Sequence, residues 1–203
     1  MKITGIKSQV KNLDRVSIYL DEEYSFSLSK NQLLEFGLAI DQALDDQQLA
    51  VLKQLSDFGK LLDRTLRFVA MRPHSKREVI DYLKRKVTEL DEQDKLVNYL
   101  VERGYINDVE FAKAWVRSRN QIKPTSHRRL LLELKQKGVD QKDIDMALGD
   151  EPHNEERALQ ELITKKRRQL RYQDSQKLMQ YLARQGFGYE DIKSALGINL
   201  QRD

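Results

Sequence analysis

Two stretches, RPHSKREVIDYL at residues 72–83 and KPTSHRRLLLEL at residues 123–134, decide how this chain is organised. A shift of 51 residues superposes the two stretches and places Ser126 over Ser75. In each stretch the serine precedes an apolar pattern of helical period, as an N-cap residue does. Each stretch is therefore predicted to be a basic turn followed by a capped helix, and together they indicate an internal repeat.

A further shift of 48 residues extends the repeat toward the C-terminus. It carries the leucines of the second stretch onto Leu178 and Leu182, and Gly138 onto Gly186. The third copy lacks the proline, but Asp174 falls on the cap position. We predict three tandem units, each with a helix, a basic turn, a second helix and a short third helix. One unit buries little surface by itself, so stacked units should form an elongated, curved array; a single irregular bundle is the alternative.

Helix ends have their own signals in this region. Ser75 and Glu78 have the spacing of a capping box. The predicted N-caps are Ser75, Asn107, Asp94 and Asp140. The predicted C-cap glycines are Gly104, Gly138 and Gly186.

The N-terminal residues follow a different pattern. Residues 16–20 and 24–28 alternate in polarity and flank Asp21-Glu22-Glu23, which predicts a β-hairpin with a three-residue loop. Residues 3–9 could add a third strand. A short helix capped by Ser29 should follow, with helical pattern resuming near Asp45.

The fold class expected is mainly α, with a small α+β module at the N-terminus. The expected domains are residues 1–59 for this module, then 60–108, 109–152 and 153–203 for the three helical repeats.

Charge is distributed unevenly along the chain. Residues 1–60 hold 7 Lys/Arg and 9 Asp/Glu, whereas the remaining residues hold 29 and 23, so the net charges are −2 and +6. This asymmetry suggests a polyanion or an acidic protein surface as partner of the C-terminal part. The chain has no cysteine, no apolar run of membrane-spanning length and no signal-peptide pattern. We expect a cytoplasmic protein without a membrane partner.

Catalytic motifs are missing from the sequence. It has three histidines and no phosphate loop, nucleophile elbow, dinucleotide fingerprint or zinc-protease motif. Asp140, Asp143 and Asp145 lack the glycine and closing glutamate of a calcium loop, and are better explained as helix N-terminal acids. We therefore expect no catalytic residue, no metal site, no cofactor and no enzymatic activity.

Basic residues are the better candidates for function. Residues 111–132 and 162–173 contain no acid, and Arg72, Lys123 and Arg171 occupy one repeat position, three residues before the cap. Such a row beside helix N-termini suits phosphates or carboxylates; the alternative is that the side-chain stems only cover apolar surface. The candidate binding residues are Arg72, Lys76, Arg77, Lys84, Arg85, Arg117, Arg119, Lys123, Arg128, Arg129, Lys165, Lys166, Arg167, Arg168 and Arg171. Trp115 lies on an apolar helical face and is expected in the core.

Several of these motifs together resemble the RecX family. They are Arg72-Pro73-x-Ser75, Gly104-Tyr105-Ile106-Asn107-Asp108, Phe111-Ala112-x-x-Trp115 and Lys137-Gly138-Val139. The likeness covers residues from about 61 to 197, and the N-terminal module looks like the extension of longer members. The third repeat departs from the motif, since it lacks the proline and the serine. Some longer members have a fourth repeat, which leaves open whether three repeats are the full set.

The resemblance implies a function that composition does not show. RecX-like proteins bind in the groove of RecA–single-stranded-DNA filaments, lower ATPase and strand-exchange activity, and favour filament shortening. The resemblance carries no catalytic residue. We therefore expect a monomeric, non-enzymatic inhibitor of RecA acting in DNA repair, recombination and the SOS response. A protein that binds DNA directly and a generic helical adaptor remain as alternatives.

Overall fold

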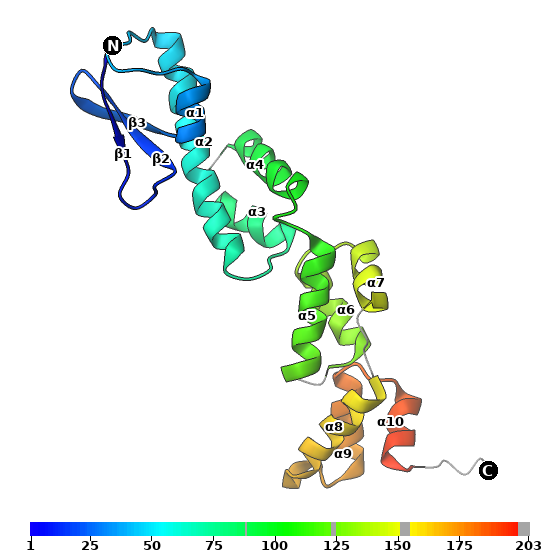
Figure 1. Ribbon diagram of the computed structural model, residues 1–203. Coiled ribbons are helices and arrows are strands. Elements are labelled where there is room, and N and C mark those ends of the chain that lie inside the picture. The colour runs from blue at the N-terminus through cyan, green and yellow to red at the C-terminus, as the bar shows by residue number, and fades with distance from the viewer. Residues whose placement is uncertain (88, 123–124, 151–154, 199–203) are drawn as a thin grey trace. The chain divides into compact units, whose positions relative to one another are not determined.

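The computed structural model describes residues 1–87, 89–122, 125–150 and 155–198 (Figure 1). It is mainly helical and has one small antiparallel sheet, as the sequence predicts. The chain divides into two compact parts. The first part comprises Met1–Ala70 and Glu89–Leu96, and the second comprises the described residues of Met71–Thr88 and Val97–Asp203.

The sheet has the order β1-β2-β3 and contains the predicted hairpin and third strand. Its strands are β1 (Ile3–Ser8), β2 (Arg15–Leu20) and β3 (Glu23–Ser29). The three-residue loop was wrong, because Glu23 pairs with Leu20 and begins β3. Asp21 and Glu22 form the turn alone, with φ of 47° and 74°. Two left-handed residues make a turn whose twist matches that of the flanking strands.

Two whole helices, and the beginning of a third within Glu89–Leu96, also belong to the first part. Helix α1 (Lys30–Glu35) begins at Ser29, whose side chain and that of Gln32 form a capping box. Helix α2 (Asp46–Ala70) packs against β3, and Leu52 joins a core that includes Ile18 and Phe26. The boundary expected between residues 59 and 60 falls inside this unbroken helix.

Helices α3 (Lys76–Lys84) and α4 (Leu90–Glu102) follow. Ser75 caps α3 by accepting the N–H of Glu78. The reciprocal half of the predicted capping box is absent, because the Glu78 carboxylate accepts from Arg72 and Lys137 instead. Asp94 lies within α4 rather than at its start, so this predicted cap was wrong. The acids of the first turn are Asp91 and Glu92.

The remaining helices form two three-helix repeats of the same order. The second repeat contains α5 (Asp108–Ile122), α6 (His127–Gln136) and α7 (Gln141–Asp150). The third repeat contains α8 (Glu155–Arg167), the 3₁₀ turn η1 (Leu170–Tyr172), α9 (Ser175–Arg184) and α10 (Tyr189–Leu196). Each repeat has its own core. Leu130, Leu134 and Ile144 are fully buried in one, and Leu178, Leu182 and Ile192 at the same repeat positions are fully buried in the other.

Candidate interaction surface

The second helices of successive repeats contact each other end to end, and this contact occurs twice. The Ser75 hydroxyl, at the start of α3, donates to the carbonyl of Lys137, the C-cap of α6, at 2.7 Å. The Ser126 hydroxyl, at the start of α6, donates to the carbonyl of Gln185, the C-cap of α9, also at 2.7 Å. The two pairs occupy equivalent repeat positions, because the shift of 51 residues carries Ser75 onto Ser126 and the shift of 48 carries Lys137 onto Gln185. We call the α3–α6 contact the first joint and the α6–α9 contact the second joint.

A second hydrogen bond recurs at each joint. The Lys76 N–H donates to Oδ1 of Asp108, at the start of α5, at 2.7 Å. The His127 N–H donates to Oε1 of Glu155, at the start of α8, at 3.4 Å. Burial raises the pKa of Asp108, and the N–H of Lys76 opposes this shift. Each acid therefore supplies an acceptor to an N–H that the preceding repeat's helix leaves unbonded.

Glycines close both joints. Gly138 and Gly186 follow the C-caps of α6 and α9 with φ of +78° and +96°, as predicted. A Cβ on Gly138 would lie 2.6 Å from Cβ of Arg77, and one on Gly186 would lie 2.6 Å from the hydroxyl oxygen of Ser126. These glycines therefore permit both the left-handed turn and the close approach of the preceding repeat.

The side-chain pair beside each joint differs in charge. In the first joint Lys137 Nζ lies 2.7 Å from Glu78, which also pairs with Arg72 at 2.8 Å. In the second joint Arg129 donates to the neutral amide oxygen of Gln185 at 2.9 Å. Burial would raise the pKa of Glu78, but hydrogen bonds from Arg72 and Lys137 lower it overall. The first joint thus contains an ion pair, whereas the second contains a charged-to-neutral hydrogen bond.

Trp115 connects the charged groups of the two joints. It is half-buried against the core of the second repeat, and Lys137 Nζ lies 5.1 Å from its ring centroid. Its indole N–H donates to Glu133 at 3.0 Å. Glu133 also pairs with Arg119 at 2.8 Å and with Arg129 at 3.4 Å. Burial would raise the pKa of Glu133, but hydrogen bonds from Arg119 and Trp115 lower it.

Two of the three residues in the predicted row of equivalent cations, Arg72 and Arg171, are among the described residues. Arg72 is half-exposed and pairs with Glu78. Lys123 lies outside the described residues. Arg171 is exposed in η1, and its guanidinium carbon lies 5.8 Å from the ring centroid of Tyr172. The two described members of the row therefore have different surroundings.

The other candidate cations of the first two repeats are largely engaged with neighbouring groups. Lys76 contributes its backbone to the first joint, and Arg77 packs on Gly138. Arg77 and Lys84 face Asp81 at 3.9 and 4.0 Å, and the Arg85 guanidinium donates to the carbonyl of Asp81. Arg117 is exposed. Within the acid-free window of residues 111–132, Arg119 and Arg129 pair with Glu133, which lies just outside it, so composition alone does not reveal this neutralisation.

The third repeat has a different charge balance. Lys165, Lys166, Arg167, Arg168 and Arg171 have no carboxylate partner among the residues that the structure describes. Lys166 instead lies over two aromatic rings, 5.3 Å from the centroid of Tyr172 and 4.7 Å from that of Tyr181. The two rings are 5.0 Å apart. This cluster retains its positive charge.

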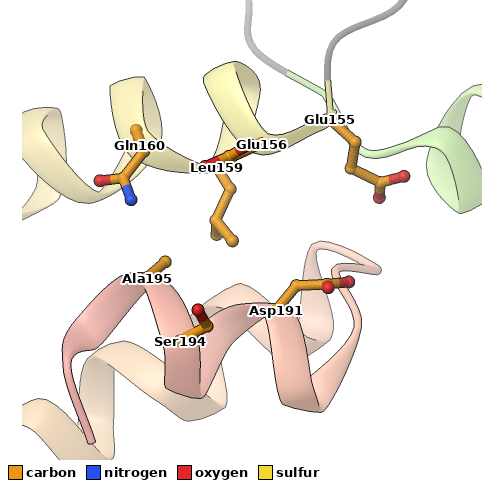
Figure 2. A pocket seen from close by; sticks show the side chains of 7 residues that line it. All are labelled: Glu155, Glu156, Leu159, Gln160, Asp191, Ser194 and Ala195. Atoms are coloured by element: carbon orange, nitrogen blue, oxygen red, sulfur yellow. The ribbon is translucent and has the colours of Figure 1, made fainter.

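A cleft of about 610 Å³ lies between α8 and α10 (Figure 2). Its acids are Glu155, Glu156 and Asp191, and Glu155 belongs to the second joint. Over the described residues, no group of three or more histidines or acids is placed to hold a metal ion. Over the same residues, no helix combines the length and apolar character needed to cross a bilayer.

We did not predict a role for Lys137, Gln185, Glu133 or the tyrosine pair from the sequence. A usable signal existed for the first two, since they immediately precede Gly138 and Gly186 at equivalent repeat positions. No comparable signal existed for Glu133, Tyr172 or Tyr181, because their partners are set by the packing of helices.

Comparison with known proteins gives consistent matches along the chain. Residues 1–45 match the regulatory protein RecX N-terminal domain, residues 107–148 the second RecX three-helix domain, and residues 154–196 the third. The regulatory protein RecX of Leuconostoc mesenteroides is 33% identical over 93% of this chain and 72% of its own length. The regulatory protein RecX of Bacillus velezensis is 32% identical over 96% of this chain and 76% of its own length.

Solved structures agree with these matches. A crystal structure of regulatory protein RecX aligns with a TM-score of 0.77 and 25% identity over 97% of this chain and 98% of its own. The RecX structure from Lactobacillus salivarius aligns with a TM-score of 0.60 over 70% of this chain and 95% of its own, and at 22% identity it supports the fold alone. With domain matches along the chain and relatives sharing a third of its residues, this protein belongs to the RecX family of regulatory proteins.

Proposed function

We propose that this protein binds RecA–single-stranded-DNA filaments and lowers their ATPase and strand-exchange activity, without catalysing a reaction itself. The observation that carries the proposal is membership of the RecX family, realised here as helical repeats with equivalent joints. We further propose that it acts as a cytoplasmic monomer in DNA repair, recombination and the SOS response.

The repeated joint supports a filamentous target. Because the same hydroxyl-to-carbonyl contact is used twice, successive repeats are connected through equivalent atoms. A repeat protein built in this way presents related surfaces at intervals, which suits a target that also repeats. The domain division at residues 60–108, 109–152 and 153–203 remains our proposal for these repeats.

The contact residues that we propose are the basic residues named from the sequence, with Arg72, Lys123 and Arg171 as the repeated position. Among these residues, Arg171 and its basic neighbours in the third repeat are the strongest candidates for contact, because no described carboxylate pairs with them. In the first repeat, Arg72 would have to exchange Glu78 for an acidic or phosphate group of the filament.

The test is a titration of RecA ATPase and strand exchange. The wild-type protein should slow both reactions. The joint change of Arg72, Lys123 and Arg171 to Ala should raise the concentration needed for half-inhibition at least about tenfold, because three charge-assisted contacts are lost. In a matched control variant, Lys11, Lys30 and Lys53 are all changed to Ala. This variant loses the same charge from exposed positions of the first part and should inhibit RecA as the wild type does.

Two outcomes would contradict the proposal. If the wild-type protein leaves RecA ATPase unchanged at saturating concentration, the regulatory function is wrong. If the folded triple variant inhibits as well as the wild type, the function stands and the cation row is wrong.

Direct binding of DNA is the second candidate function. The specific observation in its favour is the basic cluster beside two tyrosines in the third repeat, which has no carboxylate partner among the residues that the structure describes. A direct binder should hold single-stranded DNA without RecA, with strong salt dependence.

A further inference from the structure

We infer that one continuous surface of the third repeat and the second joint is a binding site for single-stranded nucleic acid. We call it the basic strip, and define it as Lys166, Arg171, Tyr172, Tyr181, Arg184 and Arg128. This inference deepens the proposed function by naming the surface that would meet the DNA of a filament.

Continuity of the strip follows from contacts. Arg171 and Lys166 both lie against Tyr172, and the two tyrosine rings are in contact. Tyr181 and Arg184 are three residues apart on α9 and therefore share a helix face. The strip thus connects η1 with the C-terminal end of α9.

At the second joint the strip enters a cleft of about 350 Å³ between α6 and α9. Arg184 and Arg128 line this cleft from the two helices, and Leu132, half-exposed, lines it as well. The volume is within the range of small-ligand pockets and could hold one nucleotide. Glu133 also lines the cleft, but three hydrogen bonds from Trp115, Arg119 and Arg129 occupy its carboxylate.

The charge of the strip is available to a ligand. In the part of the chain that the structure describes, Lys166, Arg171, Arg184 and Arg128 have no carboxylate partner. Cations in the last turn of a helix often only complement its dipole. That explanation covers Lys166 and Arg184, in the last turns of α8 and α9, but not Arg128, which is at the start of α6. It does not cover Arg171 either, which lies beyond α8 in η1.

The tyrosines favour a nucleic acid over an acidic protein. Surfaces that bind single strands combine cations for the phosphates with aromatic faces for the bases. Here the ammonium of Lys166 is held by two rings and not by an acid, so its net charge remains while its position is fixed. An acidic peptide would use the cations but would gain little from the rings.

The experiment measures fluorescence anisotropy of a short labelled oligothymidylate, with no RecA present. The wild-type protein should bind with a log–log salt slope of about −0.7 per phosphate contact. The quadruple variant Lys166, Arg171, Arg184 and Arg128→Gln should weaken binding at least about tenfold and flatten the slope by roughly 2 to 3.

The matched control changes Lys11, Lys30, Lys53 and Arg64→Gln, four exposed cations of the first part. It removes the same net charge and should bind like the wild type. If both quadruple variants lose affinity equally, binding reflects total charge and the strip is wrong.

Stacking is tested on the wild-type protein, so that no variant needs to fold. An abasic strand of the same length should bind roughly fivefold or more weakly than oligothymidylate, because base–aromatic stacking is lost. Equal binding of the two strands, or displacement by a polyglutamate peptide at equal charge concentration, would overturn the nucleic-acid assignment in favour of an acidic protein. Because RecA is absent, failure here leaves the ATPase titration as an independent test of the proposed function.

Discussion

At the scale of single residues, the glycines after the C-caps show how one residue type meets different requirements. Gly104 and Gly138 both have left-handed φ, but only Gly138 has another repeat pressed against it. The nearest atoms to a Cβ on Gly138 include Cβ of Arg77, which cannot move without its backbone. Gly149 lies in α7 with open space around it.

Alanine substitutions at these three glycines should therefore differ in their effect on the free energy of unfolding. Gly149→Ala should change the free energy of unfolding by at most about 1 kcal/mol, in the stabilising direction, because a helical glycine is replaced. Gly104→Ala should cost about 1 kcal/mol from backbone strain alone. Gly138→Ala should cost roughly 1–3 kcal/mol more, because overpacking adds to the strain. Urea unfolding measures the three values, and equal costs for Gly104→Ala and Gly138→Ala would contradict the tight first joint.

At the scale of elements, the ends of the second helices explain where joints can form. A joint needs a hydroxyl at the N-cap on one side and a left-handed glycine after the C-cap on the other. Asp174 caps α9 but has no hydroxyl to donate when ionised. Val87 stands at the repeat position of Gly138 and Gly186. The two remaining helix ends therefore lack the chemistry of the joint.

Ser126→Ala should cost more than the loss of an N-cap alone. The Ser126 hydroxyl accepts the N–H of Arg129 at 3.2 Å and donates to Gln185, so the substitution removes both bonds. We expect a loss of roughly 2–3 kcal/mol in the free energy of unfolding. Asp174→Ala removes a cap with no joint and should cost about 1 kcal/mol. Denaturant unfolding of both variants checks the difference, and equal losses would argue against a stabilising second joint.

At the scale of the whole molecule, polar contacts run without interruption through both joints. They lead from Arg72 through Glu78 and Lys137 to Trp115, and from there through Glu133 and Arg129 to Gln185. The two ends of this network differ in sensitivity to acid, because only the first joint contains a carboxylate in its side-chain pair.

The first joint should weaken at acid pH. The pKa of Glu78 is lowered in the folded protein, so its contribution to stability is present above the ordinary value of 4.5 and is lost as pH falls through the folded pKa. Glu78→Gln should lower the free energy of unfolding by about 1–2 kcal/mol at neutral pH. The difference from the wild type should shrink as pH falls below 4.5.

Thermal unfolding across pH measures this difference. The raised pKa of Asp108 acts in the opposite direction but is common to both proteins, so it cancels in the comparison. Gln185→Ala at the second joint is the control, and its effect should vary less with pH than that of Glu78→Gln, because Gln185 itself does not titrate. A difference for Glu78→Gln that stays constant down to strongly acid pH would show that the ion pair does not stabilise the first joint.

The sequence by itself determined the helices, most of their caps and the repeat. These features depend on hydrogen bonds and apolar contacts within a few residues, so Ser126, Gly138 and the leucine spacing are sufficient to predict them. The tertiary structure alone decided which groups meet across the joints. Ser75 and Lys137 are 62 residues apart, and Ser126 and Gln185 are 59 apart. No local pattern encodes such a pairing, because it depends on how the end of one helix lies against the end of another. The same reason explains why the cations of residues 111–132 looked unpaired in the sequence, whereas folding places Glu133 against Arg119 and Arg129. Among the residues that the structure describes, the cations from Lys165 to Arg171 have no such acid beside them.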